Sequence, residues 1–263
     1  MKIKIKIKEW RFLLVSLALV LQVFVCRAFE FGNESLNYRV MYKWGLVNKQ
    51  AGHATLSLRV NGSKYETRLV AASESWADHF FKVRDTLVGV VEQKGFRPVI
   101  YKKMSHEGSE HKHDEVSYSY FDNIVVGTCT RKKWDKEFRQ VLNEERVLTA
   151  RGTTVDMLSS FYYMRNRPYE NWKTGHSEAI SIFSGKRKEI LTITYLGKKS
   201  IEVGNKRYNT YHISFTFTDP SKPKKQTSDP MDAWIWANDS RIPLKLEGKL
   251  KVGKVQCFYT GSN

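Results

Sequence analysis

Hydrophobic and polar residues alternate along much of the chain, and the first clear alternation begins at Leu36. Every second residue from Leu36 to Trp44 is aliphatic or aromatic, and polar residues hold most of the intervening positions. A period of two is typical of a β-strand with one buried face. The pattern therefore predicts a strand over residues 36–44.

The dipeptide Asn61-Gly62 separates two further alternating runs, at residues 54–60 and 65–71. Both central positions of the favoured hairpin turn need a positive φ, which asparagine and glycine adopt readily. We therefore expect these two runs to pair as a β-hairpin.

The alternation continues almost to the end of the chain, with single glycines or Asp-Asn pairs at the breaks. Such spacing is typical of an antiparallel meander that curls. The expected fold is mainly β, with a single curved antiparallel sheet that forms a half-barrel or open barrel. The further predicted strands cover residues 81–91, 97–104, 115–121, 124–131, 177–183, 189–196, 200–203, 208–218, 233–237, 244–252 and 255–259.

One segment, residues 153–165, has a helical period instead. Met157, Leu158 and Phe161 belong to a set of apolar residues spaced three and four apart, which indicates a helix with one buried face. Thr154 or Asp156 can cap its start. We expect this one main helix to cover the concave side of the sheet. The pattern at residues 137–148 fits a helical turn or an irregular connection equally well.

The amino terminus has the pattern of a secretory signal peptide. Lysines alternate with isoleucines over residues 2–8, and an apolar run of about 14 residues follows. Cleavage after Ala28 would leave a signal peptide of residues 1–28 and a single β-rich domain of residues 29–263. Acylation of Cys26 is the alternative, although the bulky Val25 before it disfavours a lipoprotein signal.

The net charge is strongly positive, at +17. Residues 1–28 carry six bases and one acid, so the remainder has 38 bases against 26 acids, an excess of 12. An exported basic protein meets anionic lipid headgroups or acidic glycans before nucleic acid. We expect a location in the periplasm or at the outer-membrane periphery of the cell envelope, an anionic membrane surface as a partner and no nucleic acid. A merely solvated positive surface is the simpler alternative.

Several motifs resemble one known family. They are Asp-Met-Leu-Ser-Ser-Phe-Tyr-Tyr-Met-Arg at 156–165 with Trp-Lys-Thr-Gly at 172–175, Ala-Trp-Ile-Trp at 233–236, Arg-Ile-Pro-Leu at 241–244, Leu-Lys-Val-Gly at 250–253 and Tyr-Lys-Trp-Gly at 42–45. They resemble the exported bacterial family known as domain of unknown function 3108. The resemblance implies an envelope protein with a strongly curved antiparallel sheet, akin to half-barrel lipoprotein carriers. It implies no catalytic residue.

Candidate chemistry is sparse, and we expect no cofactor and no catalytic residue. His106, His111 and His113 lie among four acidic residues and are weak metal-ligand candidates, but a solvated hairpin tip explains them equally. There is no Gly-x-Ser-x-Gly elbow and no clustered glycine loop. The pairing of Cys129 with Cys257 is left open.

Aromatic residues are the most informative candidates. They are expected to line the concave face and bind a hydrophobic or amphipathic ligand, such as a lipid or an acylated partner. Core packing is the alternative reading of the same residues. A structural or assembly protein is the rival function, and a hydrolase is a distant third. The candidate ligand-binding residues are Tyr42, Trp44, Phe161, Tyr211, Phe215, Trp234 and Trp236.

Overall fold

The computed structural model describes residues 30–221 and 229–262. The predicted signal peptide and Cys26 lie outside the described residues. From Phe31 onward the chain forms one compact unit. Among the described helices, none combines the length and apolar character needed to cross a bilayer.

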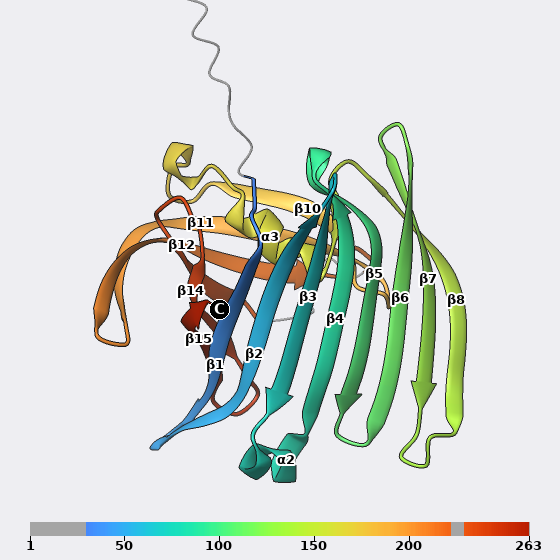
Figure 1. Cartoon of the computed structure of the whole chain (residues 1–263), viewed down its shortest axis with the longest axis horizontal. Coiled ribbons are helices and arrows are strands. Elements are labelled where there is room, and N and C mark those ends of the chain that lie inside the picture. Colours follow the sequence, from blue (N-terminus) through green and yellow to red (C-terminus); the bar gives the residue numbers. More distant parts are fainter. Residues whose placement is uncertain (1–29, 222–228, 263) are drawn as a thin grey trace, which may run out of the picture. The chain divides into compact units, whose positions relative to one another are not determined.

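The fold is mainly β, and the described strands form one 15-stranded sheet (Figure 1). Its order is β8-β7-β6-β5-β4-β3-β2-β1-β15-β14-β13-β12-β11-β10-β9. Neighbours are antiparallel except for the parallel β9–β10 pair. The strands are β1 (Glu34–Trp44), β2 (Val47–Asn61), β3 (Lys64–Ser73), β4 (Val83–Glu92), β5 (Arg97–Glu107), β6 (Glu110–Phe121), β7 (Ile124–Trp134), β8 (Gln140–Arg151), β9 (Thr154–Asp156), β10 (Ser177–Phe183), β11 (Lys188–Val203), β12 (Lys206–Thr218), β13 (Met231–Trp236), β14 (Pro243–Lys249) and β15 (Lys254–Ser262).

The sheet curls until its two ends approach each other, so that it is nearly closed and barrel-like. The end strands β8 and β9 are consecutive in the chain and are separated by two residues, Gly152 and Thr153. Side chains bridge the remaining gap: Arg146 Nη1 donates to the carbonyl oxygen of Lys186 at 3.0 Å, and Lys188 Nζ donates to that of Thr149 at 3.0 Å. Both the chain itself and these polar contacts therefore hold the ends together.

The inner face of the C-terminal half carries a packed apolar core. Leu191, Ile193 and Ile213 are completely buried there, and each buried aliphatic side chain contributes roughly 1.5–3 kcal/mol. Tyr163 and Met164 of helix α3 (Ser159–Arg165) belong to the same cluster. On the N-terminal half, Leu36, Leu56, Tyr101 and Val116 are buried on the corresponding face. We call this face inner and the opposite face outer.

Helix α3 is the element that joins the two halves of the core. Tyr162 packs edge-on against Phe31, with ring centroids 5.2 Å apart. Arg165 is 1% exposed and forms a two-pronged ion pair with Glu34 at the start of β1. The helix is thus held by apolar contacts on its flanks and by a buried guanidinium at its end.

Three local expectations need correction. The helix predicted over residues 153–165 is shorter, because Thr154–Asp156 is strand β9 and α3 begins at Ser159. The undecided segment 137–148 contains most of β8. A second helix, α2 (Ser75–Phe81), was not expected. With two α-helices of seven residues each among the described residues, a single main helix over the concave side is not confirmed.

Candidate functional site

A broad hollow lies on the outer face of strands β1 to β5, with a volume of about 730 Å³. Its position follows from the strand alternation: Leu56 and Leu58 of β2 point inward, so Ser57 and Arg59 between and after them point outward. We call it the β2–β5 hollow. Its outward-facing side chains are Ser35, Ser57, Arg59, Glu66, Arg68, Val88, Val90, Ile100 and Lys102.

The register arranges these side chains in two rows across the strands. Arg68 lies opposite Val88, and Val88 lies opposite Lys102. Since neighbouring strands are about 4.8 Å apart, the two basic residues stand about 10 Å apart on either side of the valine. In the next row Arg59 lies opposite Glu66, and Val90 lies opposite Ile100. An aliphatic floor is therefore flanked by bases.

The charges of the hollow are only partly neutralised. Lys102 Nζ forms an ion pair with Glu115 at 3.0 Å. Glu66 accepts a hydrogen bond from Asn61 at 2.6 Å. Arg59 and Arg68 are exposed, and neither forms an ion pair with an acid in the described part of the chain. Two guanidinium groups are thus available to an anion beside apolar surface.

The inner face has a different character near the β5–β6 turn, where eight charged side chains form a network. Lys103 Nζ lies 3.4 Å from Asp85 and 3.0 Å from Glu107, and Arg131 Nε lies 3.3 Å from Asp114. We call this network the charged ladder. It consists of Asp85, Lys103, Glu107, Glu110, Lys112, Asp114, Arg131 and Lys133.

The ladder is only partly shielded from solvent, since the side chain of Asp114 is 9% exposed and that of Glu110 is 42% exposed. Burial raises the pKa of Asp114 above its usual range, although Arg131 opposes the shift. Hydrogen bonds from Lys112 and Lys133 lower the pKa of Glu110 to about 2. The acids of segment 105–115, which were candidate metal ligands, instead form ion pairs with lysines and Arg131. Because the ladder is charged, this end of the interior is unsuited to an apolar ligand.

The seven aromatic candidates do not come together in one site. Tyr211 and Phe215 are buried in the inner core, and Phe161 packs partly buried against the same core. Trp44 is 58% exposed at the end of β1. Tyr42 is half-buried beside it and donates a hydrogen bond to the carbonyl oxygen of Val252 at 3.1 Å.

The expectation that Trp234 and Trp236 share a face with Tyr211 and Phe215 is wrong. Tyr211 lies opposite Ile235, whereas Trp234 lies opposite His212, so both tryptophans point to the outer face. Trp234 stacks on His212 at 4.6 Å, and Lys245 Nζ lies 4.2 Å from its ring. The strand alternation was correct, but the cross-strand register decides which alternating sets meet.

The family comparison decides the classification of this chain. The family model described as "Protein of unknown function (DUF3108)" matches residues 37–258. The chain belongs to this family. No curated protein matches it.

Solved structures support the fold of this DUF3108 protein. A β-barrel-like protein of domain of unknown function DUF1849 from Brucella abortus is similar with a TM-score of 0.60 and 11% identity, over 90% of this chain and 99% of that chain. A protein described as exported, with a YmcC-like fold, from Bacteroides fragilis has a TM-score of 0.38 and 8% identity, over 90% of this chain and 99% of that chain. The first likeness shows a shared fold, and the second is too distant to carry an argument.

Three histidines of this DUF3108 protein, His106, His111 and His113, lie together on the outer face. His106 and His111 stack with ring centroids 3.9 Å apart, and His111 also packs on Phe138 at 4.4 Å. Within residues 30–221 and 229–262, no three His, Cys, Asp or Glu side chains are arranged to hold a metal. The three histidines line a second outer hollow of about 530 Å³ with Arg84 and Trp134.

The two described cysteines are both free thiols. Cys129 is buried in β7 and Cys257 is half-buried in β15. Burial raises the pKa of each thiol to about 11. Thiols that stay protonated in this way are poor nucleophiles, so both residues act as small packed side chains in this fold.

Proposed function

We propose that this DUF3108 protein is a non-enzymatic envelope protein that binds an anionic amphipathic molecule, such as a lipid or an acylated partner, in the β2–β5 hollow. The observation that carries this proposal is the pair of exposed arginines, Arg59 and Arg68, beside the aliphatic floor. A guanidinium group binds phosphate or carboxylate through two parallel hydrogen bonds. The anionic headgroup binds these arginines, and the alkyl chain lies along the floor.

The size and lining of the hollow support such a ligand. Ligand sites usually have volumes of about 300–1,000 Å³ and combine apolar surface with a few polar groups. Each methylene removed from water contributes about 0.8 kcal/mol. Because the hollow is open, we expect partial burial of the chain and binding of roughly micromolar affinity.

The interior is the less suitable place for this ligand. In this proposal α3 covers the concave side at one end, and the charged ladder lines the other end. The protein acts in the periplasm or at the outer-membrane periphery after removal of its leader. The buried apolar core and the charge of the ladder support this assignment of the ligand to the outer face.

Calorimetric titration with lysophosphatidylglycerol below its micelle concentration tests the proposal. The wild type should bind it saturably and bind zwitterionic lysophosphatidylcholine more weakly. Arg68→Glu should weaken binding at least about tenfold, which corresponds to about 1.4 kcal/mol. Arg151→Glu is the matched control, because Arg151 is also exposed on the outer face but lies in β8. Equal affinities of the two variants would contradict the proposal.

Strand β8 supports assembly with another envelope component as a second function. It is an end strand of 12 residues, and an unpaired strand edge can accept a strand from a partner. The contacts of Arg146 and Lys188 described above lie near its carboxyl-terminal half. If assembly is the function, partner binding should survive Arg68→Glu and be lost when proline replaces Asn143.

A further inference from the structure

Large apolar side chains are exposed together at one end of the sheet. Leu46 is fully exposed in the β1–β2 turn, and Phe80 of α2 is 84% exposed. Trp44, Phe81, Leu250 and Val252 are each about half exposed. We call these six residues the turn-end rim. An exposed apolar patch of this kind marks an interaction surface.

The three segments that carry the rim are neighbours. The β14–β15 turn lies beside the β1–β2 turn, since Lys43 pairs with Lys254 across the two strands. Helix α2 lies against β2, because Glu74 N donates to the carbonyl oxygen of Ala51 at 2.8 Å. Figure 1 shows α2 and the β1–β2 turn at the same end of the strands. The six side chains of the rim therefore lie at the same end of the sheet.

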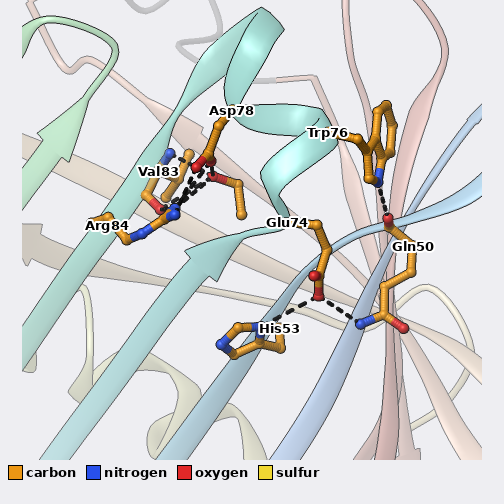
Figure 2. A network of polar contacts seen from close by, with 8 residues as sticks. Gln50, His53, Glu74, Trp76, Asp78, Val83 and Arg84 are labelled. Carbon is orange, nitrogen blue, oxygen red and sulfur yellow. Dashed lines mark hydrogen bonds and ion pairs between the residues drawn. The ribbon is translucent and has the colours of Figure 1, made fainter.

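Polar contacts fix α2 to the sheet (Figure 2), whereas Phe80 and Phe81 of the same helix are exposed. Trp76 Nε1 donates to the carbonyl oxygen of Gln50 at 2.6 Å, and the Gln50 side chain donates to Glu74 at 2.9 Å. Asp78 forms an ion pair with Arg84 at 2.7 Å. These contacts hold the first turn of α2 against the sheet. Phe80 and Phe81, at the other end of the helix, are exposed to solvent.

Lysines surround the rim, whereas its acids are already paired. Lys43, Lys49, Lys249 and Lys251 are exposed, and no acid in the described part of the chain forms an ion pair with any of them. Glu247 is neutralised by Lys245 at 2.9 Å and Lys254 at 2.8 Å. The surface thus combines apolar side chains with uncompensated positive charge.

We infer that the turn-end rim binds the surface of an anionic lipid bilayer. Aromatic and aliphatic side chains enter the boundary between headgroups and acyl chains, and lysines beside them attract anionic headgroups. Anionic headgroups complement the positive charge of the rim. The rim of a second copy of the chain would carry the same positive charge, so a lipid bilayer is the better partner. The inference concerns different residues from the β2–β5 hollow and does not depend on it.

Vesicle co-sedimentation tests the inference. The chain from Phe29 onward is used, because it contains the whole compact unit and lacks the apolar leader, which would bind lipid by itself. The wild type should bind vesicles of phosphatidylcholine with phosphatidylglycerol, bind pure phosphatidylcholine weakly, and be released by salt. The variants Phe80→Ser/Phe81→Ser and Lys249→Glu/Lys251→Glu should each reduce binding at least about tenfold.

Phe121→Ser is the matched control, because Phe121 is 62% exposed at the end of β6, beside the β6–β7 turn at the opposite end of the strands. It should bind vesicles as the wild type does. Arg68→Glu should also keep vesicle binding while losing lysolipid binding, which separates the rim from the hollow. Equal vesicle binding by the rim variants and the wild type would overturn the inference. So would rim-dependent self-association without vesicle binding, measured by analytical ultracentrifugation.

Discussion

Asp156 is a carboxylic acid with no exposed surface and is the last residue of β9, just before α3. Its Oδ1 accepts hydrogen bonds from the backbone N–H groups of Leu158 at 2.8 Å and Ser159 at 2.7 Å. Its Oδ2 has no hydrogen-bond partner in the described residues. Burial raises the pKa of Asp156 to about 6. Asp156 thus provides a hydrogen-bond acceptor for the backbone amides at the start of α3, although this requires burial of its carboxyl group.

Asp156→Asn should change the pH dependence of stability. Because the folded pKa lies above the unfolded value, the contribution of Asp156 to stability is greatest below about pH 4 and is lost as the pH rises through about 6. The variant keeps the acceptor oxygen and should lack this loss, which amounts to about 3 kcal/mol. Urea unfolding near pH 4 and near pH 7 measures it.

Asp135→Asn is the control for this experiment. Hydrogen bonds with Arg139 lower the pKa of the half-buried Asp135, so its contribution is lost only as the pH falls below about 4. Between pH 4 and 7 this control should behave as the wild type. The account of Asp156 fails if Asp156→Asn shows the same pH dependence as the wild type.

Arg165 is a second residue whose burial makes a sharp prediction. Besides its pair with Glu34, its Nε donates to the carbonyl oxygen of Arg241 at 3.0 Å and its Nη2 donates to that of Ser240 at 2.9 Å. Arg165→Met should lower the free energy of unfolding by about 3–5 kcal/mol, because Glu34 loses its counter-ion. Arg139→Met, at a site 73% exposed, should cost less than about 1 kcal/mol. Similar urea midpoints for the two variants would exclude a central role for Arg165.

At the scale of elements, closure of the sheet depends on a close approach between β7 and the end of β10. A Cβ atom added at Gly127 would lie 2.5 Å from Cδ2 of Phe183. The Phe183 ring also stacks on Tyr118, with centroids 5.7 Å apart. Glycine at position 127 therefore makes room for the ring that packs the two halves together.

Gly127→Ala should reduce stability by about 1–3 kcal/mol through overpacking. Gly32→Ala is the control, since nothing lies within 4 Å of a Cβ atom at Gly32. Thermal unfolding of both variants measures the difference. A near-neutral Gly127→Ala would mean that Phe183 moves freely and that this contact does not hold the sheet closed.

Most strands could be predicted from the alternation, and the exceptions have physical causes. In β8, Glu144 and Arg146 occupy inward positions. Glu144 lies opposite Arg131, which belongs to the charged ladder of the inner face. Inward charge removes the apolar alternation that marks a strand. Helix α2 has no buried residue, so it shows no apolar stripe, and hydrogen bonds such as that of Trp76 hold it instead.

For the whole molecule, the two faces of one curved sheet carry different kinds of side chains. The inner face carries the apolar core, to which Tyr163 and Met164 of α3 belong, and the charged ladder, and the outer face carries the β2–β5 hollow. The sequence indicates aromatic residues and bases, but it does not specify their register. Trp234 illustrates this limit, because only its pairing with His212 places it outside. Arg68 and Lys102 flank Val88 for the same reason, through pairings that no local pattern shows.

The most direct test of the central claim is to locate a bound amphiphile by nuclear magnetic resonance. The backbone amide signals of the labelled protein are followed during titration with lysophosphatidylglycerol. The account predicts saturable shifts concentrated at Arg68, Val88, Val90 and Ile100, with those of the core residue Ile213 unchanged. Shifts centred instead on Tyr211 and Phe215, or no saturable shifts at all, would contradict binding in the β2–β5 hollow.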